Sequence, residues 1–427
     1  MSASARRRAL LLLVPLVTYL SPLTPMAPAQ DPQRDKALEH ARRLLRDSPL
    51  VDGHNDLPWA IREDSVAPRD VAAYDLRQPT RGHTDLERLA RGQVGAQFWS
   101  VYVPGEYRDS GYARIQLEQI DIARQLIARY PERLALALTA ADIDREFRRG
   151  RIASLLGAEG GHALENSLGA LRTYYDLGVR YLTLTHNVTL DWADAALDSA
   201  RHQGLSPFGR EVVREMNRLG MLVDLSHVSP AVMSQALDVS EAPVIFSHSA
   251  ARALVDHPRN VPDSILSRIA ANGGVVMVTF VPAFISVEFA AWDALRQARE
   301  AEVALEVSEV PARVRRLAEW EREHPPPVAI LAQVADHIDH VHRVAGADHV
   351  GIGSDFDGIT HVPRGLEDVS TFPALFAELI RRGWSDRDLR KLAGANAIRA
   401  LRGAEKAAAR LRRQRPASTA TLEGGAR

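Results

Sequence analysis

Histidine and carboxylate side chains recur in this chain directly after short apolar segments, and the first pair has a spacing that suits a metal ion. His54 and Asp56 are two residues apart, so both side chains point to the same side of an extended backbone. One imidazole and one carboxylate that face the same way can bind one divalent cation. The pair alone is a weak indication, because the same spacing is common in surface turns.

Residues of the same types follow other apolar segments. Glu159 lies in the glycine-rich stretch GAEGG, where the backbone can approach a ligand closely. Three consecutive apolar segments end in a histidine: His186, His227 and His248. One such histidine is most simply interpreted as a hydrogen-bonded core residue, whereas three in succession indicate a shared function. Asp355 and Asp357 follow the last segment, and strand alternation does not decide between them because they are two residues apart.

Without His186, these residues form a ligand set for two metal ions that share one bridging carboxylate: His54, Asp56, Glu159, His227, His248 and one of the two aspartates after the last segment. The chain contains no cysteine, so thiolate ligands, thiolate nucleophiles and disulfides are all excluded. Imidazole and carboxylate ligands without thiolate suit zinc, and manganese and cobalt are the alternatives. A carboxylate after the last segment could also accept a proton from metal-bound water.

The apolar segments that carry these residues resemble buried β-strands. They alternate with longer amphipathic segments, as in βα units. The eight predicted strands cover 50–53, 94–101, 152–157, 181–185, 222–225, 244–247, 275–280 and 349–353. Eight parallel strands with intervening helices most naturally close into a (β/α)8 barrel of the TIM type, whose active sites lie at the carboxyl ends of the strands. We therefore expect the candidate ligands to meet at one rim of a barrel over residues 30–402.

Three segments depart from this alternation. Residues 63–91 are long and polar and predict a loop over the barrel mouth, and residues 282–327 predict a helical insertion before the eighth strand. Residues 403–427 are rich first in Ala and Arg and then in Ser, Thr and Gly, which predicts a flexible tail. A helix predicted over 334–344 carries three further histidines, which we interpret as a solvated face near the other end of the barrel: His337, His340 and His342.

The amino terminus has the layout of a secretory signal peptide over residues 1–29. Three arginines precede an apolar run at 9–20, and the small-x-small sequence Ala-Pro-Ala follows at 27–29. The apolar run is shorter than the roughly 20 residues that span a bilayer, although an uncleaved anchor is the alternative. We expect a secreted or periplasmic protein without a stable membrane anchor. The net charge of −1 gives no reason to expect nucleic acid as a partner.

Nine motifs in a fixed order resemble the membrane dipeptidase family, the renal dipeptidase branch of the amidohydrolase superfamily. They include VDGHNDLPW (51–59), EGGH (159–162), PVIFSHSAAR (243–252) and GIGSDFDG (351–358), and the resemblance extends from residue 36 to residue 402. It implies zinc-dependent hydrolysis of small dipeptides, with L-Xaa-D-Xaa substrates, β-lactam-like amides and a homodimer within the family's range. The chain lacks the cysteines and the hydrophobic C-terminal signal of mammalian members, and so resembles bacterial-type exported members.

The resemblance assigns metal ligands by position. The ligands that it implies for a first zinc ion are His54, Asp56 and Asp355. Those implied for a second zinc ion are His227 and His248, and Glu159 would bridge the two ions. The implied cofactor is therefore two Zn²⁺ per chain.

The resemblance also assigns residues to substrate binding and catalysis. His186 matches the histidine that holds the scissile carbonyl oxygen as it becomes an oxyanion, and Arg259 matches the arginine that receives the terminal carboxylate of the substrate. Asp355 matches the aspartate that shuttles protons, which selects it over Asp357. Two alternatives remain: another metal-dependent reaction on the same barrel, such as that of a lactonase, deaminase or phosphotriesterase, and a binding protein that retains the fold without activity.

Overall fold

Eight parallel strands close into a barrel in the computed structural model, which describes residues 32–105, 107 and 111–423. The predicted signal segment 1–29 lies outside the described residues. The barrel strands are β1 (Leu50–Asn55), β2 (Val94–Tyr102), β4 (Ile152–Glu159), β5 (Val179–Thr183), β6 (Leu222–Asp224), β7 (Ile245–Ser249), β8 (Val275–Val278) and β9 (Val350–Ile352). The predicted (β/α)8 fold is confirmed, and every predicted strand overlaps an observed one.

The strand order explains how the barrel closes. The order runs β2-β1-β9-β8-β7-β6-β5-β4, and β2 also pairs with β4 along most of its length, with Tyr102 opposite Glu159. A ninth strand, β3 (Leu134–Leu136), pairs with the first residues of β4 outside this ring. β3 was not among the predicted strands, because three residues are too few to show a period.

The strands read as continuous apolar runs because both of their faces are buried. All eight residues of β4 are buried, for example. Residues at alternate positions, such as Ala96 and Phe98 of β2, fill the barrel interior together with Tyr181 and Met277. The residues between them, such as Trp99, pack outward against the helices. This double burial fixes the register, and with it the rim at which each strand ends.

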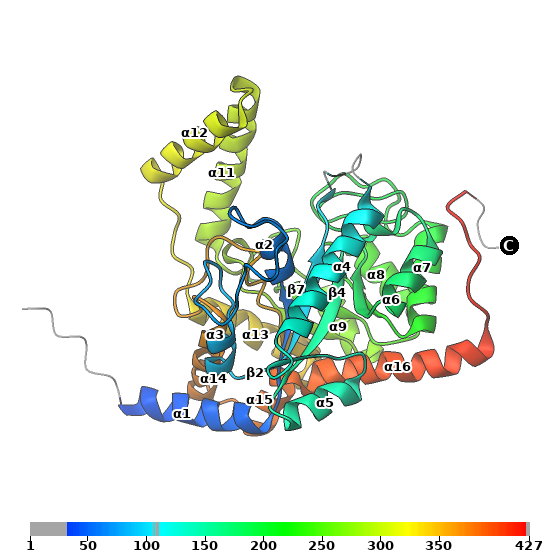
Figure 1. The fold of residues 1–427 in the computed structure, drawn as a ribbon, viewed down its shortest axis with the longest axis horizontal. Coiled ribbons are helices and arrows are strands. Elements are labelled where there is room, and N and C mark those ends of the chain that lie inside the picture. The colour runs from blue at the N-terminus through cyan, green and yellow to red at the C-terminus, as the bar shows by residue number, and fades with distance from the viewer. Residues whose placement is uncertain (1–31, 106, 108–110, 424–427) are drawn as a thin grey trace, which may run out of the picture.

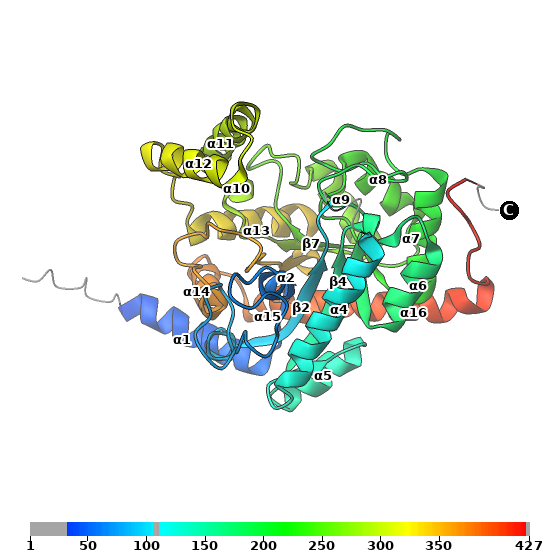
Figure 2. The same cartoon turned by 45° about the horizontal axis from the view of Figure 1, so that its top comes forward.

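Helices surround the strands on all sides (Figure 2). They are α1 (Pro32–Asp47), α2 (Leu57–Arg62), α3 (Leu86–Arg91), α4 (Tyr112–Arg129), α5 (Ala140–Arg148), α6 (Leu168–Asp176), α7 (Pro207–Leu219), α8 (Pro230–Val239), α9 (Asp263–Asn272), α10 (Pro282–Ile285), α11 (Val287–Glu306), α12 (Val310–Glu323), α13 (Leu331–Ala345), α14 (Phe372–Arg381), α15 (Asp386–Arg390) and α16 (Asn396–Gln414). No described helix combines the length and apolarity that a membrane crossing requires.

Two of the helices that follow strands begin with the same local signal. α7 and α8 each start with a proline that is preceded by a serine, Ser206 and Ser229 respectively. Each serine side chain accepts a hydrogen bond from a backbone N–H in the first turn of its helix. Serine at the cap and proline at the first helical position both favour a helix start, so the sequence sets where these helices begin.

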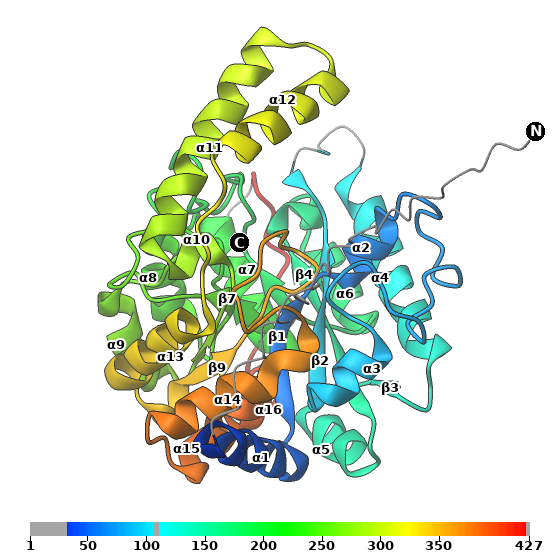
Figure 3. The same ribbon diagram turned by 90° about the vertical axis from the view of Figure 1, so that its left-hand side faces the viewer.

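The two ends of the barrel are covered differently. α1 precedes β1 and α2 follows it, so the carboxyl ends of the strands face the end from which α11 and α12 rise (Figures 1 and 3). α11 and α12 form the predicted insertion before the last strand, and they pack through Phe289, Trp292 and Trp320. The segment predicted as a loop over 63–91 ends in the short helix α3, and its earlier part reaches the mouth, where His83 and Asp357 exchange two hydrogen bonds.

The predicted flexible tail is wrong for its first half. α16 extends to Gln414 and lies across the end opposite the α11–α12 hairpin, with Ala404, Ala407 and Leu411 buried. Beyond the helix, the backbone N–H of Ser418 still donates to Glu215. The Ala-rich composition that suggested fraying instead provides a narrow, small-residue face that packs closely against the barrel.

The interpretation of the helix 334–344 as a solvated face is also wrong. His337 and His340 on α13 are only 1% and 6% exposed. His337 accepts a hydrogen bond from the backbone N–H of Ala251, directly after β7, and thus reaches the carboxyl-end loops rather than the opposite end. His340 pairs with Asp263 at 2.7 Å. Both histidines hold α13 in place, and neither belongs to a group of potential metal ligands within the described residues.

Candidate metal centre

The six predicted metal ligands meet at the carboxyl-end rim of the barrel. They come from β1 and the residue after it, the last residue of β4, the turn after β6, the last residue but one of β7 and the turn after β9: His54, Asp56, Glu159, His227, His248 and Asp355. Five of them are buried, and Asp355 is half-buried. Segments some 300 residues apart in the chain thus converge on one point because parallel strands end at the same rim.

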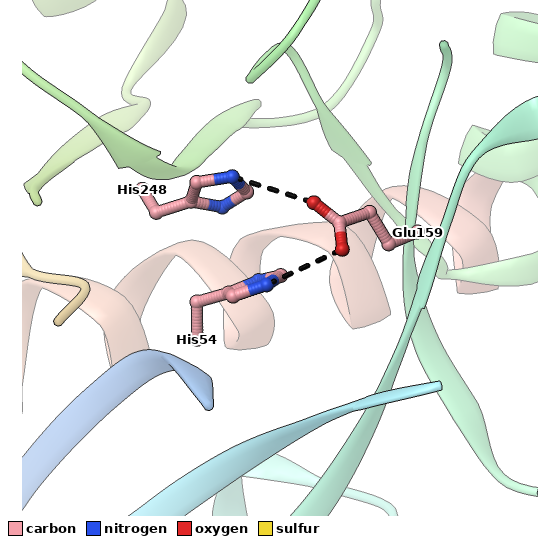
Figure 4. Close-up of side chains that lie close together, drawn as sticks. All are labelled: His54, Glu159 and His248. Carbon is pink, nitrogen blue, oxygen red and sulfur yellow. Dashed lines mark ion pairs between the residues drawn. The ribbon is translucent and has the colours of Figure 1, made fainter. Parts of the chain in front are cut away.

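The carboxylate of Glu159 lies at the centre of this cluster. Its Oε2 is 3.4 Å from Nε2 of His54. Its Oε1 is 3.1 Å from Nε2 of His227 and 3.4 Å from Nε2 of His248. Figure 4 shows that His54 and His248 face different oxygens of the carboxylate. Each oxygen therefore has its own set of imidazoles, which is the arrangement of a carboxylate between two cations.

Two aspartates, Asp56 and Asp355, lie next to His54 in this cluster of potential ligands. Nε2 of His54 is 3.1 Å from Oδ2 of Asp56, and potential ligand atoms of His54, Asp56 and Asp355 all lie within 4.8 Å of one another. The second carboxylate oxygen of Asp56, Oδ1, is buried without a hydrogen-bond partner among the described residues. A buried carboxylate oxygen without a partner is costly, and a bound cation would provide that partner.

The orientation of His54 is fixed from inside the barrel by Tyr181. The tyrosine hydroxyl lies 2.9 Å from Nδ1 of His54 and 3.3 Å from the carbonyl oxygen of Gly53. The hydroxyl can donate to the carbonyl and accept from Nδ1–H, which leaves Nε2 free to bind a metal ion. Gly157 makes this possible, because a Cβ at that position would lie 2.0 Å from the tyrosine ring.

The other two histidines are oriented in the same way. Nδ1 of His227 lies 3.1 Å from the side-chain oxygen of Asn187, which only accepts hydrogen bonds. Nδ1 of His248 lies 2.8 Å from the hydroxyl of Ser247, and that hydroxyl donates to Asp224 at 2.7 Å. Nδ1 is therefore the protonated nitrogen in both rings, and both Nε2 atoms point at the carboxylate of Glu159.

Backbone strain also concentrates at the rim. His227 and Asp355 adopt φ angles of 67° and 72°, a region that side chains other than glycine rarely occupy. Strained residues of this kind cluster at functional sites, where the surrounding structure holds them. Gly358 supplies the space, because a Cβ there would lie 2.3 Å from an oxygen of Asp56 and 2.6 Å from one of Asp355.

The electrostatics of the cluster favour bound cations. Burial raises the pKa of Glu159, and it raises the pKa of Asp355 well above its usual range, with further increases from neighbouring carboxylates. Burial, followed by the charge of Arg259, lowers the pKa of His227 well below its usual value, so this imidazole is neutral and able to bind a metal ion. Burial also lowers the pKa of His248, whereas the pKa of His54 lies well above its usual value: burial lowers it, but the charges of neighbouring groups, Glu159 and Asp56 among them, more than offset this. A buried group of carboxylates that raises the pKa of one imidazole in this way, beside two neutral imidazoles, fits divalent cations.

Arg259 lies beside the cluster, and its one hydrogen bond among the described residues that involves the guanidinium runs from Nη2 to the carbonyl oxygen of His248 at 3.5 Å. Its side chain is 1% exposed, and within the described part of the chain neither Nε nor Nη1 has a hydrogen-bond partner. The guanidinium lies over the ring of Phe284 at 5.1 Å. Burial lowers its pKa to about 10, so it stays charged at neutral pH. A buried, unpaired cation that lines a pocket is suited to an anionic ligand.

His186 faces the same pocket from the segment after β5. It is half-buried, and its ring centre lies 4.2 Å from that of His227 and 4.7 Å from that of Tyr102. Burial lowers its pKa well below the usual value, so it is a neutral hydrogen-bond donor. It also forms a potential ligand group with Glu159 and His227, so its position suits either a metal ion or the substrate.

These residues line a pocket of about 520 Å³, a size that suits a small ligand. Trp59 and Tyr102 line the wall of this pocket, whereas Phe98 packs against Tyr181 inside the barrel. Sequence reasoning missed the wall formed by the insertion, including Phe289 and Asp293. These two residues stand in an Ala- and Glu-rich helix without a motif, so no sequence signal distinguished them.

Known proteins share much of this sequence and its fold. The family described as "Membrane dipeptidase (Peptidase family M19)" matches residues 38–415. The dipeptidase verJ of Clonostachys rogersoniana is 42% identical over 389 residues, which are 88% of this chain and 90% of that protein. Dipeptidase 3 of Mus musculus is 42% identical over 373 residues, which are 86% of this chain and 67% of that protein. The crystal structure of the probable dipeptidase PvdM from Pseudomonas aeruginosa has a TM-score of 0.76 at 27% identity, covering 87% of this chain and 99% of that one.

Proposed function

Because this chain belongs to the membrane dipeptidase family, peptidase family M19, we propose that it hydrolyses dipeptides with two zinc ions that are bridged by Glu159. One observation supports the two finer parts of this proposal, the metal pair and the dipeptide as substrate. A buried carboxylate with imidazoles on both of its oxygens lies in the same pocket as the guanidinium of Arg259, whose Nε and Nη1 have no hydrogen-bond partner among the described residues. Such a pocket can hold a carbonyl and a free carboxylate of one small substrate.

The residues present suit two cations. We assign to the first His54, Asp56 and Asp355, and to the second His227 and His248, with Glu159 between them. Bound divalent cations would supply Lewis acidity toward the carbonyl oxygen and lower the pKa of the attacking water. Zinc is favoured over harder cations because three of the ligands are imidazoles.

Three side chains then act on the substrate itself. Arg259 forms a two-pronged pair with the terminal carboxylate, which a lysine could not reproduce. His186 donates a hydrogen bond to the carbonyl oxygen as charge develops on it, an interaction worth about 3 kcal/mol in the transition state. Asp355 accepts the proton that the water loses and returns it to the nitrogen of the leaving amine.

This arrangement selects for substrate length. A free carboxylate held beside the metal centre leaves room for one residue after the bond that is cleaved. L-Xaa-D-Xaa dipeptides and β-lactam amides belong to the proposed range, because both keep a carboxylate on the carbon next to the amide nitrogen. Longer peptides place another amide where Arg259 requires a carboxylate, and we expect them to be poor substrates.

Two further parts of the proposal come from the sequence and the family. We propose export to a secreted or periplasmic location, which the signal-like pattern before residue 30 supports, and a homodimer. The rival reactions of other amidohydrolases and the inactive binding protein are disfavoured by family membership. A lactone or phosphotriester would also leave the charge of Arg259 without a partner.

Hydrolysis of a dipeptide panel with and without metal tests the proposed function. We expect chelator-treated enzyme to lose activity on L-Xaa-L-Xaa and L-Xaa-D-Xaa dipeptides and to regain it with two equivalents of zinc. Release of free amino acids is measured by chromatography. Full activity in excess chelator, or no hydrolysis with any added divalent metal, would contradict the proposal.

Removal of the arginine should weaken binding of the free carboxylate. In Arg259→Ala, we expect kcat/KM for a dipeptide to fall by about 30- to 150-fold, since a hydrogen-bonded charge pair is worth about 2–3 kcal/mol. Most of the loss should appear as a higher KM. Arg268→Ala, which removes an arginine from the surface of α9, is the control. An equal loss on the dipeptide and its C-terminal amide would argue against the assignment, because the amide has no carboxylate.

A further inference from the structure

The α11–α12 insertion supplies one wall of the substrate pocket. Phe289, Asp293 and Gln297 are spaced four residues apart on α11, so they share one face of the helix, and all three line the pocket that contains the metal centre. The rest of the insertion stands away from the barrel (Figures 1 and 3). The face with these three residues is therefore the part of the insertion that a substrate can meet.

Asp293 on this face is a carboxylate whose hydrogen-bond partner is a neutral amide. The amide of Gln297 donates to its Oδ2 at 2.7 Å, and no ion pair of Asp293 is present within the described residues. Arg296, the nearest arginine on the helix, is bound to Glu321 at 2.7 Å and to Glu300 at 3.2 Å. Burial raises the pKa of Asp293, which the hydrogen bond from Gln297 opposes. A cation that entered the pocket would find this carboxylate available.

Asp293 does not belong to the metal centre. It is absent from each described group of potential metal ligands. The charges that act on Asp293 are those of Arg296, His361 and Glu300, none of which is a ligand. The α-amino group of a dipeptide is only two bonds from the carbonyl carbon that is attacked, so it stays close to that carbon. A positive charge at the end of a longer side chain can instead reach a carboxylate on another wall of the pocket, such as Asp293.

We propose that Asp293 is a specificity-determining residue that binds the cationic side chain of a lysine- or arginine-containing dipeptide; this inference rests on the proposed function. Phe289, one helical turn before Asp293, is buried and offers an apolar surface to the methylene groups of such a side chain. Arg259 would then hold the carboxylate of the substrate and Asp293 its distal positive charge.

Matched substrate pairs test this inference. Lysine and norleucine, which lacks the charge, are compared in L-Lys-L-Ala against L-Nle-L-Ala and in L-Ala-L-Lys against L-Ala-L-Nle. The readout is the ratio of the two kcat/KM values at each position. In the wild type, we expect lysine to be preferred at one position, and in Asp293→Asn we expect this preference to fall about tenfold.

Two further variants separate recognition from folding. Asp293→Lys should reverse the preference. It should improve hydrolysis of the dipeptide that carries glutamate at the position where the wild type prefers lysine, a gain that a misfolded protein cannot show. Glu302→Gln removes an exposed carboxylate of the same helix, which is paired with Arg299, and should keep the wild-type ratio. Equal ratios in the wild type and in Asp293→Asn at both positions would overturn the inference. Failure of the wild type to hydrolyse any dipeptide would instead overturn the proposed function, and the inference with it.

Discussion

Asp355→Asn is expected to keep both metal ions and to lose about 10²- to 10⁴-fold in kcat, the range that general acid–base groups contribute. The asparagine side chain has nearly the same size, and its carbonyl oxygen can still face His54 and Asp56, so the metal-binding cluster stays intact. The amide cannot accept the proton of the attacking water or return it to the leaving amine. Turnover of L-Ala-L-Ala and metal content are measured on the same samples.

The control for this variant is Asp348→Asn, which changes an exposed aspartate that pairs with Lys391. We expect wild-type turnover for it. An Asp355→Asn protein with wild-type kcat and two bound ions would remove the proposed proton-transfer role. Loss of the ions together with turnover would show instead that the charge of Asp355 is needed for metal binding.

Glu159→Gln should have a still larger effect, because one oxygen of the bridge becomes an NH₂ group. The amide can offer its oxygen to one cation, but its nitrogen then points at the imidazole nitrogens on the other side. We expect metal content to fall to one ion or fewer. Activity should fall by more than about 10³-fold, because the metal pair supplies several kcal/mol of transition-state stabilisation.

The measurement for Glu159→Gln is metal content by atomic spectrometry, together with dipeptide turnover. Glu319→Gln, which changes an exposed glutamate of α12 that faces Arg322, serves as the control. Two bound ions in Glu159→Gln would show that the carboxylate does not bridge them.

The sequence contained enough information for the barrel because its strands are buried on both faces. Apolar runs such as 152–157 stand out from the amphipathic helices, and their ends differ from those of β4 and the other observed strands by a few residues. The sequence did not predict in the same way that residues 403–414 of the expected tail belong to the packed helix α16. The small residues of α16 acquire their role only from the surface against which they pack, which includes β6, β8 and β9.

For the site, the residues at the strand ends were predictable and the residues that orient them were not. His54 and Glu159 stand at the ends of apolar runs, where a polar side chain is conspicuous. Tyr181 and Ser247 lie within strands and resemble ordinary core residues, although they set the protonation of two imidazoles. Asp293 lies in a charged helix, and only the three-dimensional structure shows that it faces the pocket.

Two histidines of α13 were predicted to be exposed and are buried in the structure. His337 and His340 looked like exposed residues because a helix with several polar residues resembles a solvated surface. In the structure their imidazoles satisfy the backbone of the segment after β7 and the carboxylate at the start of α9. A buried imidazole that has its hydrogen bonds needs no metal ion, and pattern alone cannot distinguish it from an exposed one.

Anomalous diffraction at the zinc edge, on crystals of the zinc-loaded protein, tests the two-metal centre most directly. We expect two peaks about 3.5–4 Å apart, one on each side of the Glu159 carboxylate, with His54 at the first and His227 and His248 at the second. A single peak, or peaks away from Glu159, would contradict a dinuclear zinc centre at this rim.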